Sequence, residues 1–308
     1  MAATGSATET LRAGGHRLSI GHPDKELFGR GGPTKRDLVR HYRAVAPLML
    51  PHIRGRPLAL ERFPDGIEAE GFYQKRRPQH APPWVRGVRV RRGDSDSTTM
   101  VVCDDLATLL WLADQAVVTP HPWLSRADDL RRPDRLIFDL DPPGDDFPAA
   151  RRAAYDVREV LAELELACYV MTTGSRGVHV VVPIRPELDF DDVKELARGV
   201  ADTAAARHPD RLTTRVRRNQ RGGRLFVDIL RNAYAQLAVA PYAVRPRPGA
   251  PVATPLEWAE LDGISSARAW TLRTIGDRLD ADPWHGMARH ARSPRRALDR
   301  MARLARGR

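Results

Sequence analysis

Hydrophobic and polar positions follow helical and strand periods along most of the chain. Thr34, with Asp37 three residues later, is typical of a helix start, and the apolar residues that follow recur on one helical face. Pro47 is expected to end or kink this helix because proline lacks an amide hydrogen. Residues 57–75 predict short strands around a Pro-Asp-Gly turn, and residues 104–113 predict a second capped helix.

The pattern from residue 120 onward predicts a sheet with helices between its strands. Apolar runs of strand length alternate with segments of helical period, after a loop rich in Pro, Asp and Arg. The predicted strands are residues 136–140, 167–172, 178–182, 224–230 and 236–240, the helices are residues 148–164 and 190–207, and the loop is residues 120–134. The last two strands are expected to form a hairpin. The fold class is therefore α+β, with a mainly antiparallel sheet flanked by helices and a smaller N-terminal α/β part.

This pattern also predicts the domain organisation. Residues 1–15 are polar and are expected to form a flexible tail, and residues 291–308 a basic, modestly helical tail. Between them, residues 16–290 are expected to form the folded domain, with an N-terminal part to about residue 115 and a second part from about residue 116.

Charge and cysteine content narrow the function. The 308 residues carry 50 Lys and Arg against 39 Asp and Glu, a formal net charge of +11, which favours a polyanionic partner. Two cysteines without a Cys-x-x-Cys pair exclude a disulfide framework and a cysteine zinc site. Neither a signal peptide nor an apolar stretch long enough to span a bilayer is present, so a soluble cytoplasmic protein is expected.

The segment Phe-Asp-Leu-Asp-Pro ends the first strand of the second part with two carboxylates. Side chains alternate in a strand, so Asp139 and Asp141 point to the same face. Two adjacent carboxylates repel each other, and divalent ions with oxygen ligands are a common solution. The alternative is a strand end with solvated aspartates at a turn.

Other polar residues stand out in the same half of the chain. Ser175, Arg176 and His179 belong to a glycine-framed turn whose donors would suit a triphosphate, although, taken alone, an ordinary glycine-rich turn explains them better. Asp228 lies inside an apolar strand and needs a partner, either an arginine or a shared metal ion. His121 lies in a segment flanked by prolines that is expected to be a rigid loop.

Several segments, taken in order, resemble the polymerase domain of bacterial ligase D, a member of the archaeo-eukaryotic primase superfamily. The resemblance runs from about Leu18 to Trp284. It rests on Pro-Asp-Lys at 23–25, Thr-Lys at 34–35, Arg-Phe-Pro-Asp-Gly at 62–66, Gly-Phe-Tyr-Gln-Lys at 71–75, His-Pro-Trp-Leu-Ser-Arg at 121–126, Phe-Asp-Leu-Asp-Pro at 138–142, Thr-Gly-Ser-Arg-Gly-Val-His at 173–179, Phe-Val-Asp at 226–228 and Ala-Pro-Tyr-Ala-Val-Arg at 240–245.

The resemblance implies a template-directed nucleotidyltransferase with a two-metal site. It implies that Asp139, Asp141 and Asp228 hold two divalent ions, manganese or magnesium. The residues that it implies for the incoming nucleoside triphosphate are His121, Ser175, Arg176, His179, Arg221 and Arg245, with Phe72 or Tyr73 stacking on a base. The family often has lysine at position 176, so any role specific to lysine is in doubt here.

The resemblance also implies a DNA substrate and partners. Lys25 and Lys35 would bind the 5′-phosphate of a downstream strand at a gap or break, and ribonucleotides would be preferred. The chain has neither the length for an adenylating ligase nor a Lys-x-Asp-Gly motif. We therefore expect a freestanding polymerase of non-homologous end joining that works with an ATP-dependent ligase in trans and with the end-binding protein Ku.

Other functions compete with this one. A freestanding primase or gap-filling polymerase of excision repair would share the chemistry, and primer-independent initiation would distinguish it. A non-catalytic DNA-end-binding module belongs to a different class, and function that survives loss of Asp139 and Asp141 would indicate it. A metal-dependent phosphoesterase is disfavoured because the ten histidines are scattered.

Overall fold

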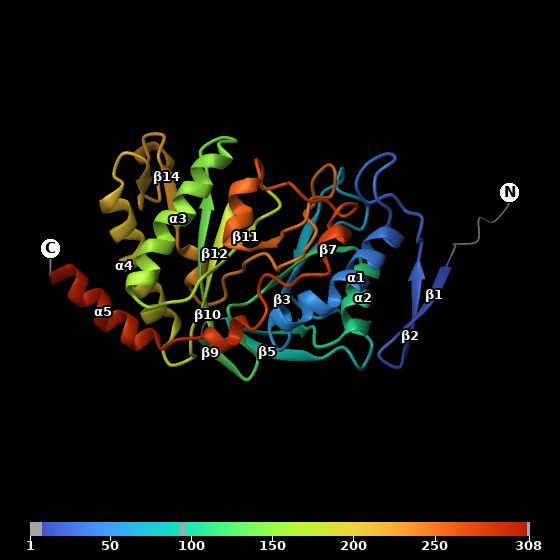
Figure 1. Ribbon diagram of the computed structural model, residues 1–308. Coiled ribbons are helices and arrows are strands. Elements are labelled where there is room, and N and C mark those ends of the chain that lie inside the picture. The colour runs from blue at the N-terminus through green and yellow to red at the C-terminus, as the bar shows by residue number, and fades with distance from the viewer. Residues whose placement is uncertain (1–7, 93–95, 307–308) are drawn as a thin grey trace. The chain divides into compact units, whose positions relative to one another are not determined.

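The computed structural model describes residues 8–92 and 96–306, which form two compact units (Figure 1). Unit 1 comprises the described residues of Met1–Pro122 together with Val239–Val252 and Trp270–Ala281. Unit 2 comprises Trp123–Ala238, Ala253–Ala269 and the described residues from Asp282 onward. Each unit is thus assembled from segments that are distant in the sequence. The predicted two parts, with one boundary near residue 116, do not describe this arrangement.

Unit 1 contains a hairpin, a five-stranded sheet and two helices. The sheet has the order β4-β3-β6-β5, and β7 also pairs with β3. The elements are β1 (Thr8–Ala13), β2 (His16–Gly21), α1 (Lys35–Ile53), β3 (Pro57–Arg62), β4 (Phe72–Gln74), β5 (Gly87–Arg92), β6 (Asp96–Val102), α2 (Leu106–Asp114), β7 (Val117–Pro122) and the 3-10 helix η4 (Ile275–Arg278). All pairs in this sheet are antiparallel.

Helix α1 begins where the sequence predicts. The Thr34 hydroxyl accepts a hydrogen bond from the Asp37 amide, and the Asp37 carboxylate accepts one from the Thr34 amide, which forms a capping box. Pro47 does not end the helix, which continues through Pro51 to Ile53. Its apolar face is buried within unit 1, and this packing offsets the hydrogen bonds that the two prolines remove.

Unit 2 is built on a six-stranded sheet of order β13-β14-β10-β12-β11-β15. Only the β13–β14 pair is parallel. The elements are β8 (Ser125–Arg126), β9 (Asp129–Pro133), β10 (Arg135–Asp141), α3 (Phe147–Glu163), β11 (Tyr169–Thr172), β12 (Val178–Pro183), α4 (Phe190–Arg207), β13 (Leu212–Thr213), β14 (Leu225–Asp228), β15 (Pro255–Leu256), α5 (Pro294–Arg306) and the 3-10 helices η1 (Arg218–Gln220), η2 (Leu230–Asn232), η3 (Trp258–Gly263) and η5 (Met287–His290). Helices α3 and α4 pack on each other and on the sheet, and α5 packs on α4 (Figure 1).

The α+β class and the mainly antiparallel sheet are confirmed, but three local predictions are wrong. Residues 8–13 of the expected tail form β1, because Leu11 and Leu18 are cross-strand partners in a hairpin, while residues 1–7 lie outside the described part. The expected loop 120–134 contains the end of β7 and the β8–β9 pair. Residues 236–240 form no strand, because the chain turns through η2 after Asp228. Among the described residues, no helix combines the length and apolar character needed to cross a membrane.

Candidate active site

Strands β10 and β14 bring three carboxylates onto one face of the unit 2 sheet. Asp139 lies directly opposite Asp228 in the antiparallel register, and directly opposite partners share a face. Asp141 follows two residues after Asp139 on β10 and therefore points to that face as well. His179 of β12, opposite Asp139 on the other side, completes the row. The predicted acidic pair and the third carboxylate thus belong to one surface, which we call the acidic face.

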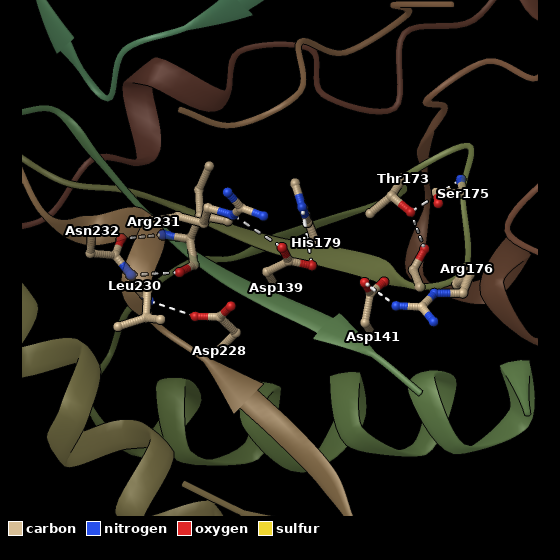
Figure 2. A network of polar contacts seen from close by, with 12 residues as sticks. Asp139, Asp141, Thr173, Ser175, Arg176, His179, Asp228, Leu230, Arg231 and Asn232 are labelled. Carbon is tan, nitrogen blue, oxygen red and sulfur yellow. Dashed lines mark hydrogen bonds and ion pairs between the residues drawn. The ribbon is translucent and has the colours of Figure 1, made fainter. Parts of the chain in front are cut away.

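Each carboxylate of the acidic face has a different partner (Figure 2). Asp139 is buried and accepts a hydrogen bond from Arg231 Nε at 3.2 Å, with His179 Nε2 at 3.4 Å from its other oxygen. Asp141 accepts a hydrogen bond from an Arg176 guanidinium nitrogen at 3.3 Å. Asp228 accepts a hydrogen bond from the Leu230 amide at 2.7 Å. Two of the three negative charges are therefore balanced by arginines of the same unit.

Burial and charge move the pKa values of two of these carboxylates in opposite directions. Burial by itself would raise the pKa of Asp139, but the charges and hydrogen bonds of His179 and Arg231 outweigh it and lower the pKa to about 2. Burial, followed by the negative charge of Asp139, raises the pKa of Asp228 above its ordinary value, despite the Leu230 amide and two nearby arginines. The surroundings of Asp228 therefore favour one further positive charge.

The acidic face offers donors of the kind that a divalent ion requires. Within the described part of the chain, no group of three or more His, Cys, Asp or Glu side chains is arranged as a metal cluster. The donors nevertheless fit in kind, since three carboxylates share one face, and hard cations prefer such oxygen ligands. His179 Nδ1 is buried and lacks a hydrogen-bond partner among the described residues, as expected of a group that faces a ligand. The present side chains are turned toward arginines and backbone rather than toward a common ion.

The glycine turn between β11 and β12 lies against the end of β10. Thr173 closes it, because its amide and hydroxyl both donate to the Gly177 carbonyl, at 3.0 and 3.1 Å. Gly174 adopts a positive φ of 63°. A Cβ atom at Gly177 would lie 2.1 Å from the Leu140 carbonyl oxygen and 2.7 Å from the Asp141 carboxylate. Only glycine lets the turn approach the acidic face this closely.

In this turn and at the start of β12, the residues predicted for triphosphate binding differ in exposure. Ser175 is partly exposed, and its carbonyl accepts a hydrogen bond from Arg268 Nε at 2.8 Å. Arg176 is exposed, whereas His179 is buried. The structure therefore brings Arg176 and His179 to the carboxylates, with Ser175 in the same short turn.

Arg221 lies beside the same strand as Asp228. Its guanidinium stacks on the Phe226 ring at 4.2 Å and donates to the carbonyls of Arg215 and Val216. Phe226 is two residues before Asp228 on β14 and so points to the same face. Arg221 therefore lies beside the strand that carries Asp228, and its guanidinium hydrogen bonds are made to its own loop.

Sequence reasoning missed Arg231 and Asn232, which lie next to the acidic face. The buried Asn232 side chain accepts a hydrogen bond from the Ile137 amide at 2.8 Å and donates to the Ile137 carbonyl at 2.7 Å, so it pairs with β10 beyond the end of β14. This pairing holds η2, and with it Arg231, beside Asp139. The sequence signal was a short polar pair three to four residues after a lone strand aspartate.

The other predicted nucleotide residues lie in unit 1. His121 is part of β7, not of a loop, and its Nε2 lies 3.0 Å from a Glu61 carboxylate oxygen. Tyr73 packs near the His121 ring, at 5.5 Å between centroids, and is 52% exposed. Burial would raise the pKa of Glu61, but His121 and the charge of Arg245 lower it. Glu61 is the member of this cluster that sequence reasoning missed.

Phe72 and the two lysines predicted for a 5′-phosphate are also in unit 1. Phe72 is 47% exposed, and the Arg62 guanidinium lies 5.5 Å from its ring centroid. The Lys35 amide donates to the Lys25 carbonyl at 2.9 Å, so the two segments lie side by side. Lys25 forms an ion pair with Asp65 at 2.9 Å, and Lys35 forms one with Asp114 at 3.4 Å.

Comparison with known proteins gives a consistent result. Residues 34–284 match the family model described as LigD, primase-polymerase domain. The chain is 33% identical over 268 residues to the multifunctional non-homologous end joining protein LigD of Mycolicibacterium smegmatis, covering 86% of this chain and 35% of that protein. It is 29% identical over 265 residues to the bifunctional non-homologous end joining protein LigD of Bacillus subtilis, covering 85% of this chain and 42% of that protein.

A solved structure agrees with these sequence matches. The polymerase domain from Mycobacterium tuberculosis ligase D in complex with DNA is 30% identical and superposes with a TM-score of 0.82, covering 89% of this chain and 99% of that one. The chain spans between about a third and two fifths of the length of the curated relatives it matches.

Proposed function

Because this chain belongs to the family of LigD primase–polymerase domains, we propose that it is a template-directed nucleotidyltransferase that extends primer 3′ ends at DNA breaks or gaps. The observation that carries this proposal is the register of β10 and β14, with Asp139 opposite Asp228 and Asp141 on the same face. Three carboxylates in such a row are the donor set of a phosphoryl-transfer site.

In this proposal, Asp139, Asp141 and Asp228 hold two divalent ions, manganese or magnesium. When bound, such ions activate the primer hydroxyl and stabilise the negative charge of the triphosphate. Arg176 and His179, beside the carboxylates, would bind phosphate oxygens, and His179 Nδ1, which has no hydrogen-bond partner in the described part of the chain, supports this role.

Further nucleotide contacts are proposed from the resemblance. Ser175, Arg221, His121 and Arg245 would contact the phosphates or sugar of the nucleotide, and Phe72 or Tyr73 would stack on a base. The exposure of both aromatic rings supports stacking, because a ring must be accessible to receive a base.

The DNA substrate is likewise a proposal. Lys25 and Lys35 would bind the 5′-phosphate of a downstream strand, in exchange for their present partners Asp65 and Asp114. The neighbouring segments and the net charge of +11 support this assignment. We further propose a preference for ribonucleotides, work in bacterial non-homologous end joining with Ku and an ATP-dependent ligase, and a cytoplasmic, nucleoid-associated location.

The test is primer extension on a gapped duplex with a 5′-phosphate at the downstream side of the gap. Wild-type protein with manganese should add template-matched nucleotides, and parallel reactions with ribonucleotides and deoxyribonucleotides measure the sugar preference. The matched variant is Asp139→Asn/Asp141→Asn, which keeps side-chain shape and removes two charges. Absence of extension by wild-type protein with any divalent metal, together with tight binding to the phosphorylated end, would instead indicate the non-catalytic end-binding module.

A further inference from the structure

Arg231 pairs with Asp139, one of the carboxylates that would hold a metal ion in the proposed function. Its Nε donates to Asp139 Oδ2 at 3.2 Å, while His179 Nε2 lies 3.4 Å from Oδ1 (Figure 2). The Asp139 side chain is only 10% exposed, so it has little room for further partners. Both of its oxygens are thus engaged by positively charged or hydrogen-bonding groups of unit 2.

A guanidinium and a divalent ion compete for such a carboxylate. Arginine stays protonated at every accessible pH, so it leaves only by moving, not by losing its charge. Two cations beside one carboxylate also repel each other. The Arg231 side chain is 42% exposed, which gives its guanidinium a route into water when another cation arrives.

Arg231 and Arg176 are about equally exposed, but the carboxylates with which they pair differ in burial. Arg176 and Asp141 are 41% and 44% exposed, so water screens their ion pair and weakens it. Asp228 accepts a hydrogen bond from a backbone amide and has no arginine within ion-pair distance among the described residues. Of the two arginine–carboxylate pairs on the acidic face, that of Arg231 with the buried Asp139 is therefore the one that water screens less.

We propose that Arg231 and a divalent metal ion are alternative partners of Asp139, so that metal binding displaces the Arg231 guanidinium. This inference rests on the metal-binding part of the proposed function. Its consequence is that Arg231 lowers the metal affinity of the protein before nucleotide or DNA is bound. The position of Arg231 is set by Asn232, whose side chain pairs with Ile137 and fixes η2 beside β10.

The test measures equilibrium binding of Mn²⁺ alone, by the electron paramagnetic resonance signal of the free ion, without nucleotide or DNA. Arg231→Gln should bind Mn²⁺ about three- to tenfold more tightly than wild type, the range expected when a partly exposed ion pair no longer competes. Arg231→Lys keeps the charge but not the planar donor group and should give an intermediate affinity. Thermal unfolding of each variant, followed by circular dichroism, checks that the fold is retained.

The matched control is Arg217→Gln, which removes one positive charge from an exposed residue of unit 2. The Arg217 side chain has no hydrogen bond or ion pair among the described residues. This variant should bind Mn²⁺ with wild-type affinity, and Asp139→Asn should weaken binding whether or not Arg231 is present.

Particular outcomes overturn the inference. An affinity of Arg231→Gln equal to or below wild type, in a protein that melts normally, shows that Arg231 does not compete with the ion. The same holds if Arg217→Gln tightens binding as much as Arg231→Gln, since a general charge effect then explains both. If the Arg231 variants show the expected changes in Mn²⁺ affinity but the wild-type protein extends no primer, the proposed polymerase is refuted and the role of Arg231 stands.

Discussion

Both units contain a carboxylate beside a histidine on neighbouring antiparallel strands. In unit 1, Glu61 of β3 and His121 of β7 are 3.0 Å apart, and in unit 2, Asp139 of β10 and His179 of β12 are 3.4 Å apart. Each of these carboxylates has a lowered pKa because its partners outweigh burial. The local pair is thus nearly the same in two different surroundings.

What differs is the rest of each face. Around Glu61 the neighbours are an exposed tyrosine and the charge of Arg245, and the carboxylate is balanced without a further cation. Around Asp139 two further carboxylates share the face, and burial together with the negative charge of Asp139 raises the pKa of Asp228. A carboxylate–histidine pair therefore does not by itself indicate a metal site, whereas an excess of carboxylates on one face indicates a need for cations.

The largest expected difference between the two faces is in activity. Asp228→Asn should lower primer extension by about a hundredfold or more, the scale of removing one group that stabilises the transition state. Glu61→Gln should lower it less than about tenfold, since Glu61 has no counterpart of the three-carboxylate row. Single-turnover extension rates of both variants measure the contrast, and equal losses in the two would contradict it.

The second contrast concerns how the strands are joined. Strands β3 and β7 pair through backbone along five positions, whereas β10 and β14 pair at three, and Asn232 continues the pairing with its side chain. Asn232→Ala removes the side-chain partner of the buried Ile137 amide and carbonyl. The free energy of unfolding should therefore fall by about 3 kcal/mol. Urea denaturation measures this, with the exposed Asn219→Ala as control. A loss within the error of the control would show that Asn232 does not join these strands.

A third contrast comes from the turn that approaches the acidic face. A methyl group at Gly177 would overlap the Leu140 carbonyl, so Gly177→Ala should lower the free energy of unfolding by about 2 kcal/mol. Gly263→Ala is the control, because nothing lies within 4 Å of its added Cβ. Denaturant midpoints of the two variants test the steric argument, which fails if both are as stable as wild type.

The smallest expected effect concerns the Glu61–His121 pair of unit 1. The pKa of Glu61 is lowered in the folded protein, so its ionised form adds stability above the ordinary value of 4.5, and this contribution disappears as the pH falls through the folded pKa. Glu61→Gln should therefore cost about 1 kcal/mol at pH 7 and progressively less below pH 4.5. Unfolding free energies of both proteins between pH 7 and pH 3 test this, and a difference that is independent of pH would exclude the ionic contribution.

The sequence by itself determined what depends on neighbouring residues. The capping box at Thr34, the helices near 148–164 and 190–207, and the shared face of Asp139 and Asp141 follow from periods of a few residues and from local hydrogen bonds. The family resemblance added the expectation that Asp228 joins them, which the register of β10 and β14 confirms.

Only the tertiary structure decided what depends on register between distant strands. Arg231 reaches Asp139 across 92 positions of sequence, and Gly177 fits against Leu140 because β12 and β10 pair where they do. The strands β8 and β9, the hairpin of β1 and β2, and the absence of a strand at 236–240 were mispredicted for the same reason. Short segments without a strong local period take their conformation from long-range packing, and such packing leaves little trace in the order of residues.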